Sequence, residues 1–269
     1  MEFVDSSLAR RFETAEATAC QNCAKAFHRQ HPDFPMAVEE IAGGSAVFAG
    51  VDSPVTQAIG VGLQGEVADS ELDHLQEFFH SRGAAAAVEL CPLVEMSLYE
   101  RFAKRGFQLF EVSDVLFRRL SAEDNKPDAV RTAVAVRRAA PEEAKLWTQT
   151  VAQGFAEHFP VTQSMLDVME GFFTAACCFI ALVNGVVAGG GAVSANRGVC
   201  GLFGASTLPE FRQRGVQTAL LSARLAWAVA QGCDLAVSIA QPGSASHRNI
   251  ERQGFRIAYT RTKLIRAVS

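Results

Sequence analysis

Residues 204–218 read GASTLPEFRQRGVQT, and this stretch joins a predicted strand to a predicted helix. Its proline ends the strand, because proline cannot donate a hydrogen bond to a sheet ladder. From Val216 onward, apolar residues recur at the spacing of one buried helical face. The first amides of such a helix have no partners within it, and the helix dipole favours negative charge there. Gly215 lets the backbone approach a phosphate, and Arg212 and Arg214 can add charge-assisted hydrogen bonds. The stretch therefore predicts an anion site.

The chain has 269 residues, of which 49% are hydrophobic and 20% are charged. This composition is typical of a globular protein with one large or two ordinary domains. No apolar run is long enough to span a bilayer. The first residues, MEFVD, lack the basic and then apolar layout of a signal peptide. We therefore expect a cytoplasmic protein.

The net charge of −4 argues against a nucleic-acid-binding protein. The charge is unevenly distributed: residues 130–269 hold 14 Lys and Arg against 8 Asp and Glu, whereas residues 1–129 hold 11 against 21. Ordinary surface solvation would explain this difference. The alternative is a basic half that holds an anionic cofactor beside an acidic half that attracts a cationic substrate.

The chain contains seven cysteines, and an odd count without a secretion signal favours reduced thiols. Cys20 and Cys23 form one Cys-x-x-Cys pair, but zinc usually takes its four ligands from two such pairs. We therefore expect no metal site.

The order of predicted elements in the second half is a further signal. Residues 130–266 predict a strand, two helices, three antiparallel strands, a helix, a strand, a helix and a closing strand. Its clearest part is a hairpin, in which an Asn-Gly pair at residues 184–185 joins two β-rich runs. The order and the anion stretch together resemble the GNAT superfamily, the Gcn-related N-acetyltransferases, whose signature reads Arg/Gln-x-x-Gly-x-Gly/Ala. Arg212, Gly215 and Gln217 hold the signature positions, and Gln217 departs from the pattern.

The two halves of the chain repeat. Arg105-Gly106-Phe107 matches Gln253-Gly254-Phe255, an offset of 254 − 106 = 148, and Arg82-Gly83 matches Gln231-Gly232, an offset of 232 − 83 = 149. Each Gly-Phe pair follows a short predicted helix and opens a final predicted strand. In the first copy, residues 64–69 (QGEVAD) replace the basic anion stretch, and their acidity would repel a phosphate.

The resemblance implies an α+β fold of two GNAT-like domains, each with a mixed, mostly antiparallel sheet flanked by helices and with splayed central strands. We expect a degenerate domain without a phosphate loop over residues 1–122, a linker over 123–129 and an acyl-CoA-binding domain over 130–269. In this superfamily the pantetheine arm lies between the splayed strands, which fall here at residues 199–208 and 235–240.

The resemblance also implies acetyl-CoA as the cosubstrate. Main-chain groups at the end of the first splayed strand would bind pantetheine, and the amides of the following loop would bind the pyrophosphate. The last helix would add a cofactor contact, although its Ser246 could instead cap that helix. The expected cofactor-binding residues are Ser206, Thr207, Leu208, Arg212, Gln213, Arg214, Gly215, Val216, Gln217, Thr218, Ser246 and Asn249.

The residues that usually carry the chemistry of the superfamily are missing from this sequence. The glutamate position falls near Gly201, the acid tyrosine position at Ile250 and the asparagine position at Gly243. The substitute catalytic residues are Glu157, His158 and His247. For each of them, a solvated surface group or a local helix cap is the alternative interpretation.

These features favour an acyl-CoA-dependent N-acyltransferase, most specifically an acetyltransferase that acts on a primary amine of a small molecule or peptide. One alternative is a non-catalytic CoA-binding sensor or regulator, which the missing glutamate and tyrosine favour. A second is an interaction scaffold made of two decayed domains. The sequence does not identify the acceptor amine, and it leaves homodimer formation open.

Overall fold

The computed structural model describes residues 3–125, 134–157 and 160–268. Of the expected linker, the first residues belong to a short 3-10 helix, η1 (Ala122–Asn125), and the remainder lies outside the described residues. The division of the chain at 122 and 130 therefore stays a prediction.

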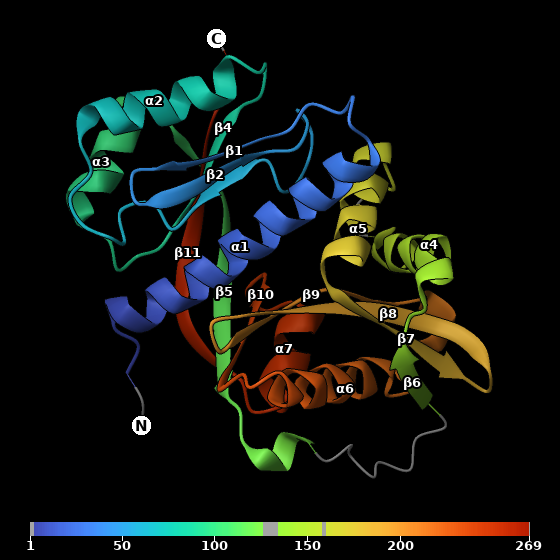
Figure 1. The fold of residues 1–269 in the computed structure, drawn as a ribbon. Helices are drawn as coiled ribbons and strands as arrows, with labels where there is room; N and C mark the ends of the chain where they lie inside the picture. Colours follow the sequence, from blue (N-terminus) through green and yellow to red (C-terminus); the bar gives the residue numbers. More distant parts are fainter. Residues whose placement is uncertain (1–2, 126–133, 158–159, 269) are drawn as a thin grey trace.

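The described strands form one eleven-stranded sheet with helices on both of its faces (Figure 1). Across the sheet the order is β1-β2-β3-β4-β11-β5-β10-β9-β8-β7-β6. The strands are β1 (Ala37–Ile41), β2 (Gly44–Phe48), β3 (Gln57–Ile59), β4 (Ala86–Leu90), β5 (Gln108–Arg119), β6 (Val134–Arg138), β7 (Cys177–Val183), β8 (Val186–Asn196), β9 (Val199–Thr207), β10 (Leu235–Ala240) and β11 (Arg256–Arg266). The helices are α1 (Ser6–Gln30), α2 (Asp69–His80), α3 (Met96–Lys104), α4 (Ala144–Phe155), α5 (Gln163–Ala175), α6 (Val216–Ala230) and α7 (Ala245–Arg252), with 3-10 turns at η2 (Pro141–Glu143) and η3 (Pro209–Phe211). None of the described helices is long and apolar enough to cross a bilayer.

The expected mixed, mostly antiparallel sheet is confirmed. Within the described strands, only β3–β4 and β9–β10 pair in parallel. The predicted hairpin is β7–β8, and its turn residues Asn184 and Gly185 have φ angles of 52° and 80°. Positive φ at both positions is the geometry that makes Asn-Gly a strong hairpin signal.

The two halves exchange their final strands. The expected closing strand of the first half, β5, pairs with β10 of the second half, and the closing strand of the second half, β11, pairs with β4 of the first. The two exchanged strands also pair with each other at the centre of the sheet. The two expected sheets are therefore joined into one, with each half completed by the other.

The ladder between β5 and β11 is symmetric about its own centre. The 148-residue offset of the sequence repeat carries the pair Arg256–Phe117, at one end of this ladder, onto the pair at the other end. Ser113 pairs with Arg261, and these two residues are themselves separated by 148 positions. A pseudo-two-fold axis therefore passes between them, and the internal repeat is visible in the strand register.

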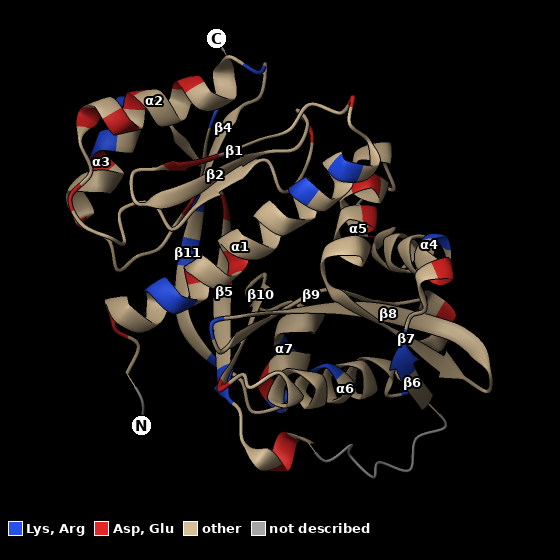
Figure 2. Cartoon of the chain, viewed as in Figure 1, with Lys and Arg blue, Asp and Glu red and all other residues tan. Residues whose placement is uncertain are grey.

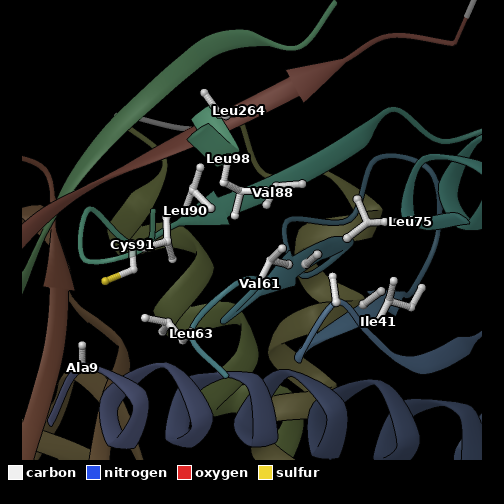
Figure 3. Packing of buried hydrophobic residues seen from close by; sticks show 14 of the residues in the cluster. Ala9, Ile41, Val61, Leu63, Leu75, Val88, Leu90, Cys91, Leu98 and Leu264 are labelled. Carbon is white, nitrogen blue, oxygen red and sulfur yellow. The ribbon is translucent and has the colours of Figure 1, made fainter. Parts of the chain in front are cut away.

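Because the final strands are exchanged, the hydrophobic cores combine residues from both halves. The core of the first half contains Leu264 from β11, which Figure 3 shows above Val88 and Leu90 of β4. The core under α6 and α7 contains Leu116 from β5. A third core lies where α1 packs against α4 and α5, and it includes the fully buried Trp147. Each half therefore buries apolar side chains supplied by the other.

Candidate functional site

The candidate site begins where β9 leaves its parallel neighbour. Strand β9 pairs with β10 only as far as Leu202, opposite Ser238, and then continues to Thr207 without pairing to β10. At the last paired position, the Ser238 hydroxyl donates to the Leu202 carbonyl at 3.3 Å. The register of β8 against β9 shifts just beyond this point, where Gly204 has a φ of 54°. A bulge of this kind bends one strand away from its neighbour, so the expected splay is confirmed.

The first half has no such diverging arm among its described residues. Strand β3 ends at Ile59, which is still paired with Glu89 of β4. The chain then turns away at Gly60, which has a φ of 80°. The opening between parallel strands is therefore a property of the second half.

The loop after β9 leads directly into an uncapped helix. Gly215 is the N-cap of α6 in a left-handed conformation, with a φ of 81° and no capping side chain. The first intrahelical bond runs from the Ala219 amide to the Gly215 carbonyl at 3.0 Å. The amides of Val216, Gln217 and Thr218 precede it and have no helical partners. These amides and the helix dipole can hold an anion.

Side chains of the loop are already engaged with the rest of the second half. Arg212 forms an ion pair with Glu157 at the end of α4, and its Nη2 donates to the Gly154 carbonyl at 3.4 Å. The Arg214 guanidinium lies 5.6 Å from the centre of the Phe211 ring. The structure therefore brings together a predicted phosphate-binding arginine and a predicted catalytic glutamate, a contact that the sequence analysis did not anticipate.

The end of β9 is tied to both neighbouring helices. The Ser206 hydroxyl donates to the Val151 carbonyl of α4 at 2.9 Å, and the Gln217 amide group donates to the Thr207 hydroxyl at 2.9 Å. The Leu208 amide donates to the Ala188 carbonyl at 2.9 Å. These bonds fix the backbone of the splayed strand beside the first turn of α6.

Both main-chain polar groups of Leu208, a predicted pantetheine contact, are already hydrogen-bonded. Its carbonyl accepts from the Phe211 amide at 3.0 Å, in addition to the bond made by its own amide. A cofactor contact at Leu208 would therefore have to share one of these hydrogen bonds. Gln213, next to the loop arginines, has a φ of 61°, so the loop turns sharply at two positions before α6.

The predicted residues of α7 differ in their surroundings. Ser246 and Asn249 are exposed. Ser246 does not cap the helix, because the cap is Ser244, whose hydroxyl accepts from the His247 amide at 3.1 Å. The Asn249 side chain accepts from Arg252 at 3.2 Å. Neither exposed side chain is held in place by the protein core.

His247 is buried, in contrast to its neighbours. Its Nε2 lies 3.1 Å from Oδ2 of Asp114 on β5, and its Nδ1 lies 3.4 Å from Oε2 of Glu251. The histidine and aspartate side chains are only 9% and 5% exposed. The Nε2 contact is within ion-pair distance but lacks hydrogen-bond geometry, so this buried nitrogen has no hydrogen-bond partner in the described structure. His158, the third predicted catalytic residue, lies outside the described residues.

No titratable side chain occupies the positions at which the superfamily carries its glutamate and its tyrosine. Gly201 lies on the paired part of β9, and Ile250 packs against the core under α6 and α7. No group of three or more side chains that could ligate a metal is present among the described residues. All seven cysteines are buried and unbridged.

A small pocket lies away from the splayed strands. It has a volume of about 80 Å³ and lies between α1 and the first-half strands, beside Glu13, Gln21 and Ser45. It includes no residue of the splayed strands or the loop.

Comparisons with known proteins agree with this geometry. Residues 145–255, which contain the splayed strands and the loop, match the sequence model of the Acetyltransferase (GNAT) family. A GCN5-related N-acetyltransferase from Kribbella flavida is similar in structure, with a TM-score of 0.69 and 15% identity over 96% of this chain and 95% of that chain. No curated protein matches the sequence.

Two further solved structures share the fold. A tandem GNAT protein from the clavulanic acid biosynthesis pathway aligns with a TM-score of 0.57 and 14% identity, over 84% of this chain and 79% of that one. A functionally unknown conserved protein from Staphylococcus epidermidis aligns with a TM-score of 0.59 and 12% identity, over 87% and 94%. These structures share the overall fold of this chain, and one of them is described as a tandem GNAT protein.

Proposed function

We propose that this protein, whose second half matches the GNAT acetyltransferase family, is an acyl-CoA-dependent N-acyltransferase. Its acyl donor is acetyl-CoA, and its acceptor is a primary amine of a small molecule or peptide. The observation that carries the proposal is the coincidence of three features at one place: a diverging strand, a left-handed glycine and an uncapped helix N-terminus.

The residues present fit acetyl-CoA. The amides of Val216, Gln217 and Thr218, with the α6 dipole, would hold the pyrophosphate. Arg212 and Arg214 would add charge-assisted bonds to it. Main-chain groups near Ser206 and Thr207 would bind the pantetheine, because this end of β9 does not pair with β10. Gln213 and Leu208 shape the loop, and the exposed Ser246 and Asn249 would contact the cofactor from α7.

The chemistry is attack of the acceptor amine on the thioester carbonyl carbon. The carbon–sulfur bond then breaks, the amine gives up a proton and the departing thiolate gains one. A main-chain amide of β9 would stabilise the tetrahedral oxyanion. Strand β9 carries no carboxylate, so holding a neutral amine beside the thioester supplies much of the rate. Glu157, just after α4, and His158 remain proposed acceptor-side groups.

The direct test is binding of acetyl-CoA to loop variants, measured by calorimetry. Gly215→Asp places a carboxylate against the pyrophosphate, so we expect at least a 10-fold loss of affinity. The control is Gly232→Asp at the other end of α6, because Gly232 has a similar φ of 77° and shares the backbone strain without the anion site. Equal affinity in both variants would contradict the proposed cofactor site.

Turnover is tested separately by release of free CoA thiol in the presence of varied primary amines. Amine-dependent release supports the transferase. Tight binding without release supports the second candidate, a CoA-binding sensor or regulator, which the apolar Ile250 at the acid position favours.

A further inference from the structure

The strand exchange brings one side chain from each half to the last helix of the other half. Asp114 on β5 lies opposite Ala240, the final residue of β10. Thr262 on β11 lies opposite Leu90, the final residue of β4. Asp114 and Thr262 are related by the 148-residue offset, so they are equivalent positions about the pseudo-two-fold axis.

The residues that these two side chains face are also equivalent. Asp114 faces His247 on α7, and Thr262 faces Tyr99 on α3. His247 and Tyr99 are again 148 positions apart. The same junction therefore holds an ionisable pair in the half with the phosphate loop and a pair of hydroxyls in the half without it.

The geometry around Asp114 orients it toward the histidine. The Thr260 hydroxyl donates to Oδ1 of Asp114 at 2.5 Å, which leaves Oδ2 for His247 Nε2 at 3.1 Å. The other imidazole nitrogen faces Glu251, whose side chain is 45% exposed. The imidazole thus lies between a buried carboxylate and one in contact with solvent.

The junction also lies on the cofactor side of the sheet. Helices α6 and α7 pack on the same core, and Figure 1 shows both on one face of β8–β10. Ala240 ends β10 beyond the point where β9 has diverged. In the proposed function the departing thiolate stays with the cofactor, on the face that carries α6. His247 lies on α7. Ile250, one turn later on the same helix, has no proton to give.

We propose that Asp114 is a positioning residue, supplied by the first half, that holds His247 as the proton donor for the departing thiolate of the second half. The inference rests on the proposed function. In this step the carbon–sulfur bond breaks and the thiolate takes the Nδ1 proton of the imidazolium, on the Glu251 side, while Nε2 stays toward Asp114. Nδ1 then recovers a proton from solvent. The first half is therefore part of the reaction machinery, although it has no phosphate loop.

The experiment compares Asp114→Asn, His247→Gln and the double variant with matched variants of the other junction, Thr262→Val and Tyr99→Phe. Calorimetry measures acetyl-CoA binding, and single-turnover kinetics measure thioester cleavage with an amine identified by CoA release. We expect His247→Gln to slow cleavage about 100-fold, the scale of general acid catalysis, and Asp114→Asn at least 10-fold. Acetyl-CoA affinity should change less than twofold, and the first-half variants should cleave at the wild-type rate.

Two further measurements separate proton donation from structural support. The double variant should be no slower than His247→Gln alone, because Asp114 acts through His247. With the acetyl thioester of 4-nitrothiophenol, whose thiolate leaves without a proton, both defects should disappear. Equal slowing on this donor, additive effects or wild-type cleavage by Asp114→Asn would overturn the inference. A wild-type protein that neither binds nor cleaves acetyl-CoA would instead overturn the proposed function, and the inference with it.

Discussion

At the scale of single residues, Arg212 has two competing partners. In the proposed function it binds the pyrophosphate, whereas in the described structure it pairs with Glu157 and the end of α4. Both side chains are more than a third exposed, so this ion pair contributes little to stability. The ion pair instead affects ligand binding, because a bound phosphate would have to replace Glu157 as the partner of Arg212.

We therefore expect Glu157→Gln to strengthen acetyl-CoA binding by a few-fold at most, since it frees Arg212 at small energetic cost. Calorimetry at low salt measures the change. Glu142→Gln, an exposed glutamate just before α4, serves as the control. A weaker affinity in Glu157→Gln would argue against the competition. A fall in turnover with unchanged affinity would instead assign Glu157 to the chemistry.

A second residue-scale feature is the buried charge cluster at the pseudo-two-fold axis. Arg261 is 2% exposed and contacts Glu13, Glu16 and Glu89. The Tyr259 hydroxyl donates to Glu13 at 2.7 Å. Burial raises the pKa of Glu13 from 4.5 to about 7, although Arg261 opposes this change.

The raised pKa predicts how stability depends on pH. Between pH 4.5 and 7 the folded state keeps a proton that the unfolded chain releases, so stability falls as pH rises through this window. The loss due to Glu13 is up to about 3 kcal/mol. Glu13→Gln should flatten the dependence of melting temperature on pH, whereas Glu77→Gln, an exposed glutamate of α2, should not. An unchanged slope in Glu13→Gln would refute the assignment.

Neither of these residue-scale contacts could be predicted from the sequence. Glu157 and Arg212 are 55 positions apart, and Glu13 and Arg261 are 248 apart. No periodicity links such pairs, since each depends on how helices and strands pack. The geometry of the loop between β9 and α6 was predictable because its strand, glycine and helix are adjacent in the chain, so local backbone chemistry determines it.

At the scale of elements, the packing of α4 on β9 has little spare room. Gly154 lies where α4 touches the end of the splayed strand, and a Cβ atom there would be 2.3 Å from Ser206 Oγ and 2.5 Å from Ser206 Cβ. The side chain of Ser206 also bonds to α4. Helix α4 and strand β9 are therefore closely packed at this point.

Gly154→Ala tests this coupling. Alanine normally improves a helix interior by about 1 kcal/mol, but the overpacking here should cost about 1–3 kcal/mol. We expect a lower melting temperature and weaker acetyl-CoA binding, because the strand that carries the proposed pantetheine contacts must shift. Gln153→Ala, on the exposed side of the same turn, should leave both unchanged. A Gly154→Ala protein as stable as this control would show that α4 adapts freely.

Element types were the most predictable part of the fold. The β7–β8 hairpin and the α6 N-terminus follow from residues that favour one local geometry, such as Gly185 and Gly215. The strand partners of β10 were not predictable. Pairing with β5 and pairing with β11 would use the same antiparallel ladder and the same apolar alternation, so the local pattern does not distinguish them.

At the scale of the whole molecule, the two halves are interlocked although their charges differ. Figure 2 shows Asp and Glu concentrated along α2 of the first half, which keeps open the interpretation of an acidic half that attracts a cationic acceptor. The shared sheet and the mixed cores indicate that neither half is complete alone.

Expression of residues 1–125 and 130–269 as separate chains tests this interdependence. Alone, each fragment exposes an unpaired strand edge and apolar surface, so we expect aggregation or weak folding. Co-expressed fragments should form a 1:1 complex that binds acetyl-CoA, as judged by size exclusion and calorimetry. The full chain, cut at an inserted protease site after residue 127, is the control and should stay associated. A monomeric 130–269 fragment with wild-type affinity would contradict the prediction.

The exchanged strands also determine when each strand can find its partner during synthesis on the ribosome. Strand β4 emerges early, but its neighbour β11 lies about 170 residues later in the chain. At about 5–20 residues per second, β4 waits roughly 10–35 s with one edge unpaired. For most of that time β5 can pair with neither β10 nor β11, because both are still to come. Nascent chains of this protein should therefore depend on holding chaperones until β11 has been released.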